Sequence, residues 1–158
     1  MEYSEMSEDL KRKVDLYNQQ VPDGLLGMFA SSAVADDGFG VTLIVGGNVF
    51  SGYLTTERGW VEAIAKMPGN GSEALSAGML KGMEGIEEKP ALSDEEWNAL
   101  DDVEQREFRL KWTPSFIHLA DANQFGFGGP VMSEPTPMRF RLSEVQGWYF
   151  GKMEKGEG

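Results

Sequence analysis

The feature that most constrains the fold is a β-hairpin signal in residues 38–56, GFGVTLIVGGNVFSGYLTT. Apolar side chains occupy both the odd and the even positions of residues 41–45, and Gly47-Asn48 supplies residues that tolerate a positive φ. β-Branched and aromatic residues resume directly after this turn. Because both faces of the first strand carry apolar side chains, we expect it to be central in a sheet and largely buried.

The length of the chain predicts one domain. A chain of 158 residues is long enough to bury a core of its own. Within a single domain of residues 1–158 we distinguish an N-terminal helical arm (1–37), a first hairpin (38–56), a helical insert (57–112), the remaining strands (113–153) and a polar tail (154–158).

Charge and composition restrict the partners. The formal net charge of −12, from 26 acidic and 14 basic residues, disfavours nucleic acid and anionic membranes as partners. The chain has no cysteine, which excludes disulfides and thiolate sites and fits a reducing compartment. The N-terminal residues are polar and acidic, unlike a signal peptide, and no stretch of about 18 apolar residues occurs. We therefore expect a soluble, cytoplasmic protein.

The arm carries an apolar stripe with helical spacing over residues 3–19. The stripe consists of Tyr3, Met6, Leu10, Val14 and Tyr17. Residues 25–29 predict a short second helix or an apolar arm. We interpret the arm as a cover for the open side of the sheet; the alternative is a docking helix for a partner.

The insert predicts three helical segments. The first two span residues 57–66 and 72–83, and the third opens at Ser93, where Ser93 and Glu96 have the spacing of a capping box. Residues 84–107 are strongly acidic, which is typical of a solvated helix face and alternatively of an acidic docking surface. The acidic candidates for such a surface are Asp101, Asp102 and Glu104.

Strands return after the insert, and they set the predicted fold class. Residues 115–121, 138–144 and 147–153 read as strands, the last two as a second hairpin, and residues 123–137 read as a long loop rich in glycine and proline. Together with strands at 40–46 and 48–56, this predicts an α+β fold with a small five-stranded antiparallel sheet. The sheet is either closed like an SH3- or Sm-like barrel or open with helices on one face.

The sequence offers no catalytic, cofactor or metal signature. His118 is the only histidine and lies inside a predicted strand, where a structural role is favoured over general base catalysis because no partner is identifiable. The glycines of residues 126–129 do not sit between a strand and a helix, so they do not predict a phosphate-binding loop.

Arg139 and Arg141, with Lys152 beside them, form the one basic patch that the sequence suggests. Such a patch can serve solubility and edge protection. Its functional interpretation is contact with a carboxylate-rich surface, such as the acidic helix of a second copy of this chain, which would give self-association.

Two blocks of the chain, residues 39–65 and residues 115–153, carry a recognisable pattern. The second block contains FIHL and the run Arg141, Val145, Gly147, Trp148, Gly151 and Lys152. Together the two blocks resemble the gas vesicle accessory protein GvpU family. The resemblance implies a non-enzymatic cytoplasmic protein that acts in vesicle clustering or assembly. Its implied partners are gas vesicle shell proteins, a second copy of itself, or both.

Three alternatives remain, one of which is another small intracellular protein-interaction domain. An Sm-like oligomeric nucleic-acid module shares the strand pattern, but the charge opposes it because binding to phosphates needs a surface of lysine and arginine. A small hydrolase or isomerase built on His118 is disfavoured for lack of a catalytic partner.

Overall fold

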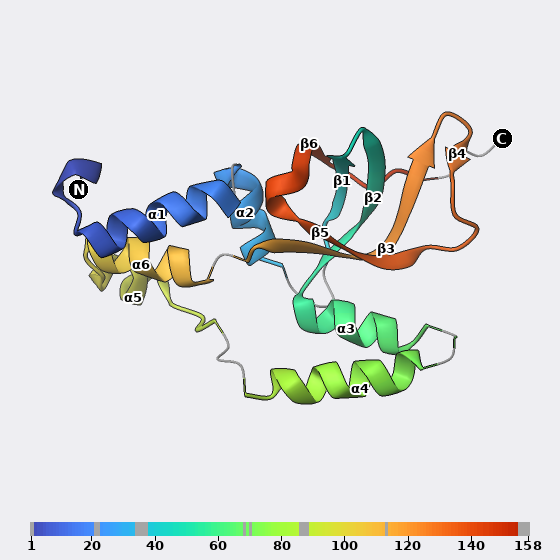
Figure 1. Ribbon diagram of the computed structural model, residues 1–158, viewed down its shortest axis with the longest axis horizontal. Helices are drawn as coiled ribbons and strands as arrows, with labels where there is room; N and C mark the ends of the chain where they lie inside the picture. The colour runs from blue at the N-terminus through green and yellow to red at the C-terminus, as the bar shows by residue number, and fades with distance from the viewer. Residues whose placement is uncertain are drawn as a thin grey trace.

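The structure combines a bent antiparallel sheet with helices that gather mainly at one end of an elongated molecule (Figure 1). It is a computed structural model that describes residues 2–20, 23–33, 38–67, 69, 71–85, 89–112 and 114–154. The helices are α1 (Glu8–Gln20), α2 (Gly24–Ser31), α3 (Glu57–Ala65), α4 (Ser72–Met83), α5 (Asp94–Ala99) and α6 (Asp102–Trp112), with the 3-10 turns η1 (Tyr3–Glu5) and η2 (Leu142–Glu144). The strands are β1 (Gly40–Val45), β2 (Asn48–Thr55), β3 (Phe116–Gly126), β4 (Gly129–Pro130), β5 (Thr136–Arg141) and β6 (Val145–Phe150).

The first hairpin forms as predicted, with its turn one residue earlier. β1 and β2 pair from Gly40 opposite Tyr53 to Val45 opposite Asn48. The turn residues are Gly46 and Gly47, whose φ values of 57° and 77° are left-handed and so favour glycine. The sheet order β4-β3-β2-β1-β6 places β1 between two strands, which confirms that it is central.

The predicted second hairpin is wrong. β5 pairs with β3, and β6 pairs with β1, so the two consecutive strands lie on different neighbours. The 3-10 turn η2 separates them, because Leu142 turns into the core and its N–H donates to the carbonyl oxygen of Ser115. In the described part of the chain no pairing joins β5 to β6. The sheet is therefore open there, and a closed barrel is not confirmed.

In the residues that the structure describes, the sheet has six strands rather than the predicted five, because part of the predicted loop is ordered as strand. β3 continues to Gly126 and turns back through β4. The side chain of Asn123, 7% exposed, holds this hairpin: its Nδ2 donates to the Met132 carbonyl oxygen and its Oδ1 accepts from the Met132 N–H, each at 3.0 Å. A buried side-chain amide that pairs with the backbone N–H and carbonyl groups of a neighbouring segment in this way favours a strand over a loop.

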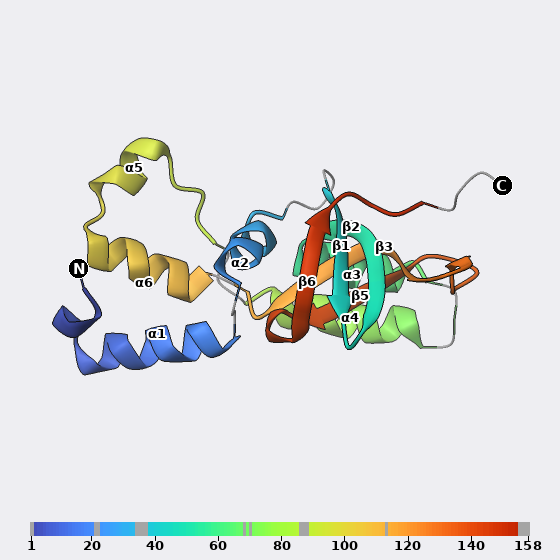
Figure 2. The same cartoon turned by 90° about the horizontal axis from the view of Figure 1, so that it is seen from above.

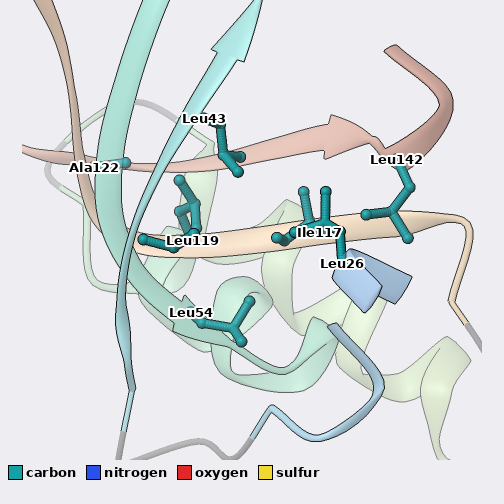
Figure 3. Packing of buried hydrophobic residues seen from close by; sticks show 8 residues of the cluster. Leu26, Leu43, Leu54, Ile117, Leu119, Ala122 and Leu142 are labelled. Carbon is teal, nitrogen blue, oxygen red and sulfur yellow. The ribbon is translucent and has the colours of Figure 1, made fainter. Parts of the chain in front are cut away.

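The core lies between the sheet and α2 (Figure 3). Its buried members come from β1, β2, β3, η2 and α2; they are Leu26, Val41, Leu43, Leu54, Ile117, Leu119, Ala122 and Leu142. The Asp23 carboxylate links α2 to β6, because it caps α2 and also accepts a 2.7 Å hydrogen bond from Trp148 Nε1. The ring of Phe29 packs on Trp148 and Phe150. The part of the arm that covers the sheet is thus α2.

The other helices form two groups (Figures 1 and 2). α3 and α4 lie side by side near the sheet, whereas α1 lies beside α6 at the far end of the molecule. The predicted capping box is confirmed, since Ser93 Oγ accepts from the Glu96 N–H and Glu96 Oε2 accepts from the Ser93 N–H. The segment then breaks at residues 100–101 into α5 and α6. The polar tail, apart from Glu154, and residues 86–88 of the acidic run lie outside the described residues.

Candidate interaction surfaces

The side chain of Arg139 on β5 makes several contacts with its neighbours in the chain. The residue opposite it on β3 is His118. Its guanidinium carbon lies 3.9 Å from the ring centroid of Phe116 and 5.5 Å from that of Trp60, and its Nη2 is 3.3 Å from Glu57 Oε1. Stacking and an ion pair hold the side chain, which is 31% exposed, against β3 and α3. Much of the binding capacity of this arginine is therefore used within the chain.

Arg141 and Lys152 have different surroundings. Arg141 lies two positions further along β5, with its guanidinium carbon 5.8 Å from the Phe116 centroid. Lys152 follows β6, and its Nζ lies 4.3 Å from the ring centroid of Tyr53 on β2. Since β3 stands between β2 and β5, the structure brings the two arginines together and leaves Lys152 apart from them.

The acidic candidates gather at the start of α6. Asp101 Oδ1 accepts hydrogen bonds from the N–H groups of Val103 and Glu104, at 2.8 and 2.9 Å, and Glu104 Oε2 accepts from the Asp101 N–H at 2.9 Å. This is a capping box, so these two carboxylates stabilise the helix end that they occupy. Asp101, Asp102 and Glu104 are all exposed and form one acidic corner of the molecule.

His118 is buried in a setting that keeps it neutral. It is 5% exposed, and its ring centroid lies 5.5 Å from that of Trp60. Burial, together with the charge of Arg139, lowers the pKa of His118 to about 4. Among the described residues, His118 Nε2 and Trp60 Nε1 are the buried side-chain nitrogen atoms that lack a hydrogen-bond partner. Both belong to the layer between β3 and α3.

A pocket that the sequence did not predict lies at the helical end. Its volume is about 840 Å³, and it lies between α1, α2, α6 and the segment before α5. Trp97, Phe108 and Trp112 supply its aromatic side chains, and Arg109 stacks on Trp97 with its guanidinium carbon 5.1 Å from the ring centroid. The spacing of these aromatic residues in the sequence was the available signal, but the helices that complete the pocket come from distant segments.

The described residues contain no group of three or more histidine, aspartate and glutamate side chains placed to hold a metal ion. Within the same residues, none of the helices is both long enough and apolar enough to span a bilayer.

A match to a known protein family covers most of the chain. A family model described as gas vesicle protein GvpU-like matches residues 23–153, which include all of the strands and α2 to α6. No curated protein and no solved structure matches the chain.

Proposed function

The chain belongs to the gas vesicle protein GvpU-like family, and we propose that it is a non-enzymatic accessory protein that bridges vesicles or self-associates in vesicle clustering or assembly. The observation that carries the proposal is the family match, which includes the whole sheet and most of the helices. Family membership makes it a gas-vesicle-related protein. The proposed partners are shell proteins of the vesicle, a second copy of this chain, or both, at the vesicle surface in the cytoplasm.

The arrangement of charge supports a bridging role. Asp101, Asp102 and Glu104 lie at the start of α6, and Arg139 and Arg141 lie on β5. Figure 1 shows α6 at the helical end of the elongated molecule and β5 in the sheet. Opposite charges on separate parts of one molecule allow it to contact two partners at once. Several weak contacts of this kind add up to strong attachment when both partners present many copies.

The state of the only histidine supports a non-enzymatic role. At 5% exposure, His118 is out of reach of a substrate, and its lowered pKa keeps it unprotonated at neutral pH. It packs against Trp60 as part of the sheet–helix layer. The structural interpretation of His118 is therefore favoured over general acid–base catalysis.

The test is binding to isolated gas vesicles by flotation, at low and at moderate salt. We expect the protein to float with the vesicles at low salt and to be released as salt rises, because exposed charges are screened over about 10 Å at 0.1 M salt. Failure to float with vesicles even at low salt would overturn the proposal.

A charge-reversal pair identifies the surface. Arg141→Glu should reduce flotation, whereas Lys81→Glu, which makes the same change in net charge on an exposed position of α4, should leave it unchanged. Equal losses in the two variants would mean that net charge alone controls binding, and that the arginines of β5 form no specific surface.

A further inference from the structure

The tip of the β3–β4 hairpin presents an aromatic side chain with no cover. Phe127 is 116% exposed, more than in the extended reference state, and glycines flank it on both sides. The hairpin below it is firmly held by the two hydrogen bonds between Asn123 and Met132 and by a 2.7 Å bond from the Val131 N–H to the Gln124 carbonyl oxygen. A preformed aromatic anchor loses little conformational entropy on binding, and such anchors dominate the energy of protein interfaces.

The pocket at the helical end has the properties of a receptor for such a side chain. Its volume of about 840 Å³ lies in the range of sites that enclose an organic group. Trp97, Phe108 and Trp112 supply aromatic surfaces against which a phenyl ring can pack edge to face.

The charges of the hairpin and of the pocket are complementary. The pocket lining contains three basic side chains, those of Lys89, Arg106 and Arg109, and one carboxylate, that of Asp94. The hairpin segment from residue 121 to residue 138 contains Asp121 and Glu134 and no lysine or arginine. Basic side chains therefore outnumber acidic ones among the residues that line the pocket, which favours an acidic segment over a basic one.

We propose that Phe127 of one copy inserts into the pocket between α1, α2 and α6 of a second copy. The β3–β4 hairpin and the helices α1 and α6, which line the pocket, lie toward opposite ends of the long axis of the molecule (Figure 1), so the hairpin cannot occupy the pocket of its own chain. The contact joins two different surfaces, and a bound pair leaves one hairpin and one pocket open. Repetition of this contact builds chains or rings of molecules. The inference rests on the proposed function, for which it names the self-association surface.

The test uses two variants of the full chain that disable opposite halves of the contact. Phe127→Ser removes the anchor, and Ala91→Trp narrows the pocket by placing an indole ring in it from an exposed position in the segment before α5. Phe39→Ser is the matched control, because Phe39 is another exposed aromatic residue, at 64%. Molar mass is measured by light scattering across protein concentration.

We expect the molar mass of the wild type and of Phe39→Ser to rise above that of the monomer as the protein concentration increases. Each disabling variant alone should need a protein concentration on the order of 10- to 100-fold higher to associate to the same extent. An equimolar mixture of Phe127→Ser and Ala91→Trp should form dimers and stop there, because one variant keeps its pocket and the other keeps its hairpin. A wild type that stays monomeric, unchanged association of Phe127→Ser, or a mixture that stays monomeric would overturn the proposal.

Vesicle flotation of the same variants separates this inference from the proposed function. Wild-type protein that floats with vesicles but stays monomeric in their absence overturns the hairpin contact and leaves the proposed function standing. Loss of flotation in Ala91→Trp with normal flotation of Phe127→Ser shows that the pocket holds a vesicle segment instead of a second copy, and it too overturns the contact. The specific dimer in the mixture, with no flotation of the wild type, supports the contact and rejects the proposed function.

Discussion

The hydroxyl oxygens of Thr42 and Ser51 lie 2.9 Å apart at directly paired positions of β1 and β2, and both residues are fully buried. They attach the chain that follows β6 to the sheet. The Met153 N–H donates to Ser51 Oγ at 2.7 Å, and Thr42 Oγ1 donates to the Gly151 carbonyl oxygen at 2.8 Å. Because the Thr42 hydrogen is used in this way, Ser51 donates to Thr42, and the two hydroxyl groups form a continuous chain of hydrogen bonds.

Replacement of Thr42 by valine should therefore lower the free energy of unfolding by about 1–3 kcal/mol, because the Ser51 hydroxyl and the Gly151 carbonyl both lose a buried partner. Urea unfolding followed by tryptophan fluorescence measures the change. Thr42→Ser is the control, since it keeps the hydroxyl group. It should keep most of the stability that Thr42→Val loses. Equal losses in the two variants would point to packing of the Thr42 methyl group as the cause.

His118 should make stability depend on pH below neutrality. The pKa of this base is lowered from 6.5 to about 4 by folding, so the unfolded chain takes up the proton first. The contribution of neutral His118 to the free energy of unfolding is complete above about pH 6.5 and is lost as the pH falls toward 4. At pH 5 this loss amounts to about 2 kcal/mol.

The measurement is the free energy of unfolding of wild type and His118→Gln at pH 7 and pH 5. Other titrating groups act on both proteins alike, so the advantage of the wild type over the variant should shrink by about 2 kcal/mol at the lower pH. An advantage that is the same at both pH values would mean that His118 titrates normally in the folded protein.

Arg139 and Arg141 should differ in what they do for stability. Arg139→Lys should cost about 1 kcal/mol, because an ammonium group cannot reproduce the stacking on Phe116 and Trp60. Arg141→Lys should change stability little, since its guanidinium group lies further from the ring of Phe116. Thermal unfolding of the two variants is measured in parallel. An equal shift of Tm in both variants would contradict the prediction that Arg139 contributes more to stability than Arg141.

Two glycine-to-alanine changes should have opposite signs. A Cβ atom at Gly52 would lie 2.9 Å from both the Cα and the Cβ of Ala122 on the neighbouring strand, so Gly52→Ala should destabilise the protein by about 1–3 kcal/mol. A Cβ at Gly78 meets no atom within 4 Å, and this residue is exposed inside α4. Gly78→Ala should therefore stabilise the protein by up to about 1 kcal/mol. Denaturant midpoints give both values, and a stable Gly52→Ala variant would mean that β2 and β3 can move apart.

The hairpin of residues 38–56 and the capping box at Ser93 were predictable because their signals are local. Two adjacent glycines tolerate the left-handed turn, and a serine three residues before a glutamate satisfies the free N–H groups of a helix end. The family could also be identified from short runs of residues in the strands, as the match to residues 23–153 confirms. These features need only the chain neighbours of each residue.

The partners of the later strands were decided by the tertiary structure. Strands β5 and β6 are close enough in sequence to form a hairpin, yet burial of Leu142 between them sends β5 to β3 and β6 to β1. The lowered pKa of His118 likewise needs α3 over β3, and the pocket needs helices that are distant in the sequence. The amino-acid sequence by itself determined the first hairpin, the capping box at Ser93 and the alternation of the strands, because these follow from local sterics and hydrogen bonding. Only the folded chain decided which surfaces meet, because burial depends on residues far apart in sequence.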